Sequence, residues 1–185
     1  MNNKVLIAIV FLLMVAAQLF VPAKMISNRE DVLKNGKEFK FKTAPIDPTD
    51  PFRGSYISLY FDETQFLLKD KSKWETGEKI YVYLKTDSLG YAKIDNVSKD
   101  KPVSNIDFIE AKVSYVNNDS KGNTISIEYP FDRFYMEESK AENAETVYGK
   151  YQNDSTYPAY AKVYIKDGDA VLKDVIVKGK SIKDY

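Results

Sequence analysis

The sequence predicts a β-dominated α+β protein, in which one N-terminal transmembrane helix precedes an antiparallel sandwich- or barrel-like domain with one or two short helices. Three observations lead to this fold class. An uninterrupted apolar run opens the chain. About eight later segments alternate apolar and polar residues with the period of a strand, and turn residues separate them. Beyond the first 33 residues, only the segment from Glu138 to Tyr151 repeats its apolar residues at helical spacing.

The opening run, Val5 to Val21, has Gln18 as its only polar side chain. Its seventeen residues are at the short edge of a membrane span. With Lys24 extending its side chain to the interface, the run can cross a hydrocarbon core of about 30 Å. A signal peptide cleaved after Ala23 is the alternative. The length and bulk of the run favour an uncleaved anchor that enters the bilayer.

We expect residues 1–26 to form this anchor and residues 27–185 to form one extracytoplasmic domain. A very short tail ahead of a signal-anchor stays in the cytoplasm by default, which places the domain in the periplasm of a bacterial inner membrane. Just beyond the anchor, Ser27 or Asn28 can cap a short helix that ends near Leu33.

The composition excludes several kinds of site. The chain has no cysteine and no histidine, so disulfides, thiolate or imidazole metal sites, thiol nucleophiles and Ser-His-Asp catalysis are unavailable. Its 27 basic and 27 acidic residues balance, which argues against a nucleic-acid-binding face. No glycine-rich loop for phosphate is present. We therefore expect no cofactor and no bound metal.

Two hairpins are expected in the second half of the chain. The alternating runs Phe108 to Val116 and Thr124 to Tyr129 are joined by a polar loop that suits a hairpin. The runs Ala159 to Lys166 and Ala170 to Lys178 flank the dipeptide Asp167-Gly168, which favours a type I′ turn.

A strand expected after residue 55 separates its side chains into two faces, Tyr56, Ser58 and Tyr60 on one and Ile57, Leu59 and Phe61 on the other. If this strand pairs with the alternating strand from Lys79 to Lys85, Tyr81 and Tyr83 complete a phenolic stripe. Such a stripe can bind glycans, peptides or protein partners. The alternative is that the tyrosines lie beneath a helix or a second sheet.

A proline-rich acidic turn from Asp47 to Gly54 precedes that strand. Its prolines fix the backbone, and Asp47 and Asp50 can accept hydrogen bonds from amides of the same turn. The same carboxylates could bind a hard cation, but two of them fall short of the six to eight oxygens that calcium takes. Arg53 can bind a carboxylate or phosphate, or pair with Asp47, Asp50 or Glu137.

The residues Gly54 to Tyr60 resemble the signature that names the GDYXXLXY family of bacterial membrane-anchored proteins, with Ser55 in place of the signature aspartate. The block from Arg133 to Glu137 and the hairpin at Asp167-Gly168 are also similar to the family. The resemblance implies a location at the membrane and a neighbouring polytopic membrane protein. It implies no chemistry, because the function of the family is unknown.

We therefore expect a membrane-anchored accessory or scaffolding subunit, without enzymatic activity, that docks a polytopic inner-membrane partner through its periplasmic domain. Residues 5–26 contact the lipid bilayer. Arg133 has Asp132 and Glu137 as candidate partners. An envelope enzyme or glycan- or ligand-binding module that uses Asp47, Asp50, Arg53 and Glu137 is the alternative. The candidates for the interaction face are Asp47, Asp50, Arg53, Gly54, Tyr56, Tyr60, Arg133 and Glu137.

Overall fold

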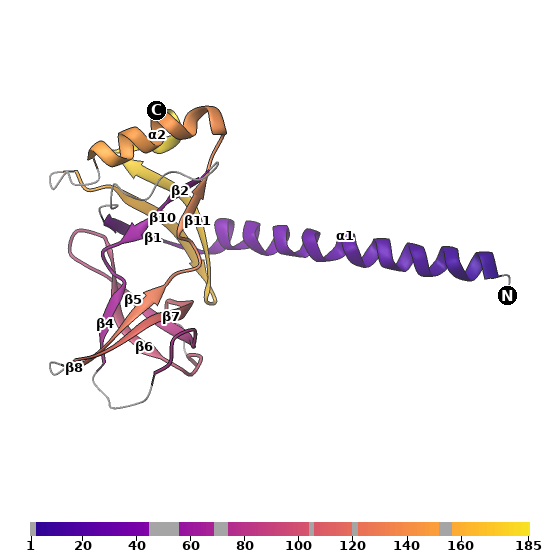
Figure 1. Cartoon of the computed structure of the whole chain (residues 1–185), viewed down its shortest axis with the longest axis horizontal. Coiled ribbons are helices and arrows are strands. Elements are labelled where there is room, and N and C mark those ends of the chain that lie inside the picture. Colours follow the sequence, from indigo (N-terminus) through magenta and orange to yellow (C-terminus); the bar gives the residue numbers. More distant parts are fainter. Residues whose placement is uncertain (1–2, 45–55, 69–73, 104–105, 120–121, 152–156) are drawn as a thin grey trace.

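A computed structural model confirms the expected fold class. A long N-terminal helix leads into a strand-rich domain whose strands form a nearly closed barrel-like sheet, with one other α-helix packed on it (Figure 1). The structure describes residues 3–44, 56–68, 74–103, 106–119, 122–151 and 157–185.

The helices and strands follow one another along the chain as α1 (Asn3–Asn35), β1 (Lys37–Ala44), β2 (Tyr56–Ser58), β3 (Tyr60–Phe61), β4 (Gln65–Leu67), β5 (Lys79–Thr86), β6 (Ala92–Ser98), β7 (Phe108–Asp119), β8 (Gly122–Glu128), β9 (Arg133–Tyr135), α2 (Glu138–Tyr151), β10 (Tyr160–Lys166), β11 (Asp169–Val177), β12 (Lys180–Ser181) and the 3-10 helix η1 (Ile182–Asp184).

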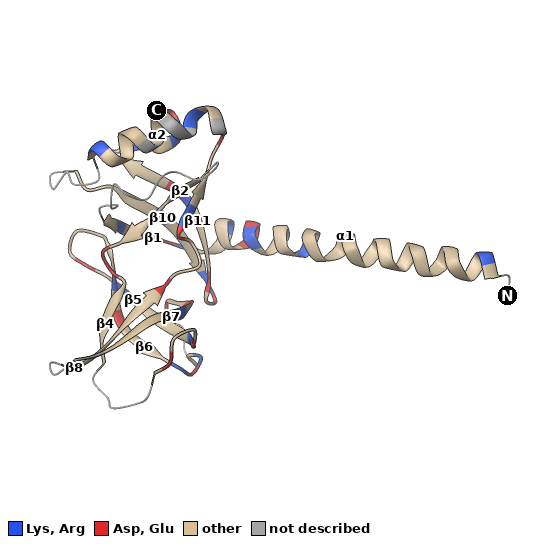
Figure 2. Ribbon diagram, viewed as in Figure 1, with Lys and Arg blue, Asp and Glu red and all other residues tan. Residues whose placement is uncertain are grey.

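The N-terminal helix α1 is continuous and is long and apolar enough to cross a membrane, with a mean hydropathy of 2.7 over its most apolar window. The expected separate helix, capped at Ser27 or Asn28, is wrong, since α1 passes through both residues and through Pro22. A proline removes one backbone donor, and the residues on either side keep their own hydrogen bonds. Lys4 and Lys24 bound a long stretch of α1 without charged residues, which Figure 2 shows in tan.

The C-terminal end of α1 is fixed to the domain. Asp31 accepts a hydrogen bond of 2.6 Å from the Lys166 ammonium of β10, and Val32 is buried. Gly36 donates its amide to the Val32 carbonyl at 2.8 Å, and a Cβ at Gly36 would overlap that oxygen and lie 3.0 Å from the Ile165 carbonyl oxygen. Only glycine fits this close approach of helix and strand.

The strands form two five-stranded sheets and one two-stranded ribbon. The anchor sheet has the order β12-β11-β10-β1-β3, the second sheet has the order β4-β8-β7-β5-β6, and β2 pairs with β9. Isolated bridges at Lys40–Tyr91 and Ile109–Gly168 join the two sheets. In Figure 1 the anchor sheet and α2 lie in the upper half of the domain, and the second sheet lies in the lower half.

The core between the sheets is aromatic. Phe41 of β1, Phe61 of β3, and Tyr129 and Phe131 of the β8–β9 connection contact one another with ring centroids 5.1 to 5.9 Å apart. The Tyr129 hydroxyl donates to the Glu63 carbonyl at 2.6 Å, which satisfies the one polar atom that this cluster buries.

Local sequence patterns predicted several elements correctly. The expected helix, Glu138 to Tyr151, is α2, which buries Ala144 and Tyr148 completely. Both hairpins form, and Asp167 and Gly168 have the positive φ values, 54° and 97°, that a type I′ turn requires. The face of Ile57, Leu59 and Phe61, which alternation separates from the tyrosines, is buried. The alternating residues Phe39 and Phe41 of β1 and Ile80, Val82 and Leu84 of β5 are buried as well.

Candidate functional site at the base of the helix

Four of the eight candidate residues for the interaction face, Asp47, Asp50, Arg53 and Gly54, lie outside the described residues. The structure does describe the other four. Tyr56 lies on β2, Tyr60 on β3 and Arg133 on β9, while Glu137 is exposed just before α2.

The strand expected from residue 55 onward divides at Leu59. Its first part, β2, pairs with β9, and its second part, β3, pairs with β1. The Leu59 amide donates to the Asp132 carbonyl at 2.7 Å and so continues the first pairing by one residue. This division carries Tyr56 away from the anchor sheet and places it opposite Tyr135.

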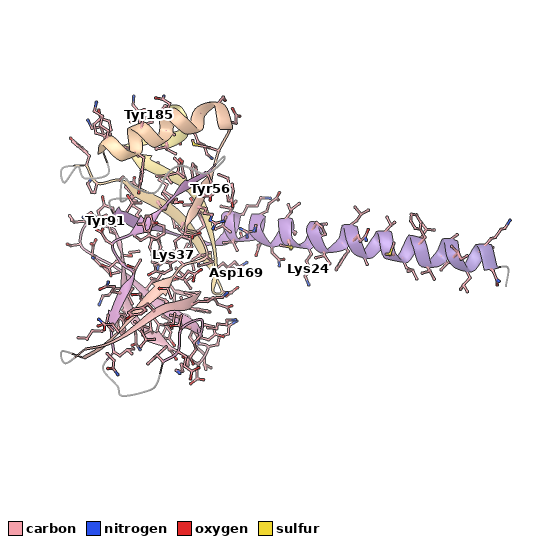
Figure 3. The ribbon with its side chains drawn as sticks, viewed as in Figure 1. Lys24, Lys37, Tyr56, Tyr91, Asp169 and Tyr185 are labelled. Atoms are coloured by element: carbon pink, nitrogen blue, oxygen red, sulfur yellow. The ribbon has the colours of Figure 1, made fainter. Side chains whose placement is uncertain are left out.

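The β2–β9 ribbon brings Tyr56 and Arg133 together, two residues that the sequence singled out in separate segments. The rings of Tyr56 and Tyr135 lie 5.5 Å apart, and the Arg133 guanidinium lies 5.1 Å from the centre of the Tyr56 ring. Figure 3 shows Tyr56 in the upper part of the domain. The result is an aromatic surface with a cation on it, which we call the ribbon face (Tyr56, Arg133, Tyr135).

Hydrogen bonding and neighbouring groups keep the Arg133 guanidinium protonated. Donation to the Tyr135 hydroxyl raises the pKa of the guanidinium, and the nearby Tyr56 and Asp132 add to the effect. The expected pairing with Asp132 is a long contact of 4.0 Å. Among the described residues, no carboxylate other than Asp132 lies within ion-pair distance of Arg133, and this includes Glu137. Arg133 therefore stays charged with much of its donor capacity left over.

The four-tyrosine stripe does not form. β5 pairs with β6 and β7, so Tyr81 and Tyr83 belong to the second sheet and do not lie beside β2. Tyr135 takes their place next to Tyr56. The alternation of β9 could have predicted this, because residues two apart on a strand share a face and Tyr135 lies two residues after Arg133.

A groove opens beside the ribbon face, where α1 meets the anchor sheet. It consists of a cavity of about 480 Å³, lined by residues of α1, β9, β11 and η1, and a neighbouring cavity of about 330 Å³ closer to the N-terminal part of α1. We call the two together the basal groove. Both cavities are lined by Arg29, Pro130, Ala170 and Val171.

The larger cavity is basic. Among the residues that the structure describes, one carboxylate, that of Asp132, lines it beside four cations, Arg29, Arg133, Lys173 and Lys183. Sequence reasoning missed three of these cations, because they come from α1, β11 and η1 and no local pattern connects them.

Aromatic rings lie beneath three of the four cations. The Lys173 ammonium lies 5.0 Å from the Tyr164 ring, and the Lys183 ammonium lies 5.1 Å from the Phe134 ring, as Arg133 lies over Tyr56. Within the part of the chain that the structure describes, neither lysine forms an ion pair with a carboxylate, and the same holds for Arg29. These cations are available to an external anion.

Metal chemistry finds no support in the described residues, where no group of three or more acidic side chains could hold an ion. The site instead combines stacking, hydrogen bonding and positive charge. Such a combination suits recognition of a partner or of an anion.

Comparison with known proteins supplies a family. A family model described as GDYXXLXY protein matches residues 18–175, from within α1 to β11. Neither the comparison with curated proteins nor that with solved structures gave a match. Because the matched residues cover most of the 185-residue chain, the protein belongs to the GDYXXLXY family.

Proposed function

We propose that the protein is a membrane-anchored accessory subunit that stands on the periplasmic face of a bacterial inner membrane and docks a polytopic membrane protein through its domain. The observation that carries this proposal is the fixed joint between α1 and the anchor sheet. Asp31, Val32 and Gly36 hold the helix against β10.

A fixed joint favours docking over free diffusion. A domain that only needs to stay near the membrane is served by a flexible linker, whose length and composition set its reach. Here the membrane helix runs into the domain without a break and enters β1 after one residue, Gly36. The ribbon face is then held at a constant height and angle over the bilayer, which lowers the entropy cost of binding a partner in the same membrane.

The ribbon face has the composition of a binding centre. Tyrosine and arginine are enriched among the residues that contribute most to protein interfaces. Tyr135 is 65 % exposed although it lies on a strand, and Arg133 is exposed beside it. Their rigid ring contacts leave little side-chain freedom to be lost on binding.

A second feature, within the apolar part of α1, also supports docking to a polytopic membrane protein. Pro22 lacks an N–H, so the carbonyl of Gln18 loses its usual helical donor, and the Gln18 side chain adds an amide at the same place. Gln18 lies about 9 Å along the axis from Lys24, within the apolar segment. Polar groups in hydrocarbon are stabilised by hydrogen bonds to neighbouring helices. A polytopic protein supplies such helices.

Purification of the tagged full chain from native membranes in mild detergent tests the docking proposal. We expect one multi-pass membrane protein to co-purify. The double substitution Tyr56→Ala and Arg133→Ala should reduce its recovery about tenfold or more, because both residues lie in the centre of the ribbon face. Lys85→Ala, on the second sheet, is the matched control and should leave recovery unchanged. Repeated recovery of the protein alone would sink the proposal.

The periplasmic orientation has its own test. Because the chain contains no cysteine, one introduced cysteine reports its own side of the membrane. A membrane-impermeant maleimide applied to spheroplasts should label Leu89→Cys, whose site is 78 % exposed, and should spare Lys4→Cys at the other end of α1. The reverse pattern would place the domain in the cytoplasm.

A further inference from the structure

We propose that the basal groove binds an anionic phospholipid, with its phosphate headgroup held by Arg29, Arg133, Lys173 and Lys183. This inference does not depend on the docking of a protein partner. It is supported by the depth of the groove relative to the bilayer, by its charge, by the fixed position of its cations and by its apolar entrance.

The groove lies at headgroup depth. At about 1.5 Å of rise per residue, a hydrocarbon core of about 30 Å takes roughly 20 residues, which α1 supplies from Val5 to Lys24. Arg29 is then about 7.5 Å beyond the core, and the headgroup layer on each side is roughly 5 to 8 Å thick. Figure 3 shows Lys24 on the free part of α1 and Asp169 near the base of the helix.

The charge of the groove is not balanced within the protein. Within the described part of the chain, four cations line the larger cavity against one carboxylate, that of Asp132, which lies 4.0 Å from the Arg133 Nε. On the second sheet, by contrast, lysines are paired, with Lys79 held by Glu110 at 2.6 Å and Lys85 held by Asp95 at 2.9 Å. An uncompensated basic pocket next to a membrane helix is a site that anionic headgroups occupy.

The cations are held in place before a ligand arrives. Each of Arg133, Lys173 and Lys183 lies over an aromatic ring, at 5.0 to 5.1 Å from its centre. Immobilising a long basic side chain costs conformational entropy on binding, and contact with a ring reduces that cost in advance. Arginine can also meet two phosphate oxygens at once.

The apolar entrance favours a lipid over a free anion. The smaller cavity, on the side of the bilayer, has an apolar wall beside Asn28 and Arg29, made of Met25, Val32, Pro130, Ala170 and Val171. Its acidic residues are Glu110, which pairs with Lys79, and Asp169 at the β10–β11 turn. A free phosphate gains nothing from an apolar wall, whereas the glycerol and first methylenes of a phospholipid pack on it while the headgroup enters the basic cavity.

Native mass spectrometry of the full chain in mild detergent, with phosphatidylglycerol and phosphatidylcholine added in equal amounts, tests this inference. We expect preferential retention of phosphatidylglycerol, weakened by added salt. The triple substitution Arg29→Gln, Lys173→Gln and Lys183→Gln should reduce that preference about fivefold for each cation removed. Its matched control, Lys85→Gln, Lys93→Gln and Lys99→Gln, removes the same charge from the second sheet, away from every residue of the groove, and should leave the preference intact.

Two results would overturn the inference. Equal retention of both lipids, with circular dichroism showing a folded protein, means that the groove does not select an anionic headgroup. Displacement of phosphatidylglycerol by millimolar inorganic phosphate means that the site takes a free anion and that the apolar entrance plays no part. An unchanged lipid signal in the presence of phosphate supports the lipid as the ligand.

Discussion

The two five-stranded sheets have similar sizes and a shared core, but they treat their surface charges differently. The second sheet and its connections hold four lysines in ion pairs, namely Lys79–Glu110, Lys85–Asp95, Lys93–Glu63 and Lys99–Glu78. The anchor sheet uses ion pairs to hold its own elements together, as in Lys166–Asp31 and Lys42–Asp62. Two of its other cations, Lys173 on β11 and Lys183 on the adjoining η1, line the basal groove. The second sheet therefore supports the fold, whereas the anchor sheet borders the basal groove, with the ribbon face beside it on β2 and β9.

The largest loss of stability is expected from a substitution at the place where the two sheets meet. Gly168 has a φ of 97°, and a Cβ there would lie 2.5 Å from the Phe108 ring of the second sheet. Gly168→Ala should destabilise the full chain by about 3 to 4 kcal/mol, because backbone strain and overpacking add. Gly77→Ala shares the positive φ but has open space around it and should cost about 1 to 2 kcal/mol. Urea unfolding in detergent compares them, and equal losses would contradict the role of Gly168 as a joint.

A smaller loss of stability should appear at alkaline pH. The unfolding that it causes should begin on the side of the anchor sheet. Burial raises the pKa of Tyr148, on the α2 face that packs against the core, to about 12. The unfolded chain loses this proton near pH 10, so the stability that the neutral phenol contributes is complete below pH 10 and is lost as the pH rises to about 12. The expected loss is roughly 2 to 3 kcal/mol.

Urea unfolding at pH 9 and pH 12 measures that loss. Tyr148→Phe should reduce the pH dependence by about this amount, while Tyr129, whose pKa burial also raises, contributes equally in both proteins. Both phenols are neutral at pH 9, so the stabilities measured there serve as the reference. Hydrogen exchange should show α2 opening before the second sheet. An equal pH dependence in the two proteins would exclude Tyr148 as its source.

The smallest changes in stability are expected when single lysines of the two sheets are replaced. Lys85→Gln breaks an exposed ion pair and should lower stability by less than about 1 kcal/mol. Lys173→Gln and Lys183→Gln remove like charges that face one another across the groove, so stability should stay constant or rise slightly. Thermal unfolding at low salt shows whether each substitution raises or lowers the stability. Similar losses at all three positions would mean that the groove cations are paired within the protein.

What could be predicted from the sequence was local. Alternation placed Ile57, Leu59 and Phe61 on one face, which is buried, and the Asp167-Gly168 dipeptide predicted its turn. Both predictions succeeded because strand period and turn chemistry act over a few residues. The helix at Glu138 to Tyr151 was found for the same reason. These features depend on residues that are close in the chain.

The remainder depends on contacts between distant segments. The division at Leu59 arises because β9 competes with β1 for the same strand, and no pattern in residues 56–61 records that competition. The basal groove forms from α1, β9, β11 and η1, so its cations converge only after the sheets have assembled. The continuity of α1 was missed because Pro22 and the polar residues after it resemble a helix end.

Site-specific photocrosslinking in native membranes tests the central claim most directly. A photoreactive phenylalanine analogue at Tyr135, on the ribbon face, should form an adduct with one multi-pass membrane protein. The same analogue at Leu89, exposed beside the second sheet, should form none. An adduct at Leu89 with none at Tyr135 would contradict the assignment of recognition to the ribbon face, and absence of any adduct at both positions would contradict docking itself.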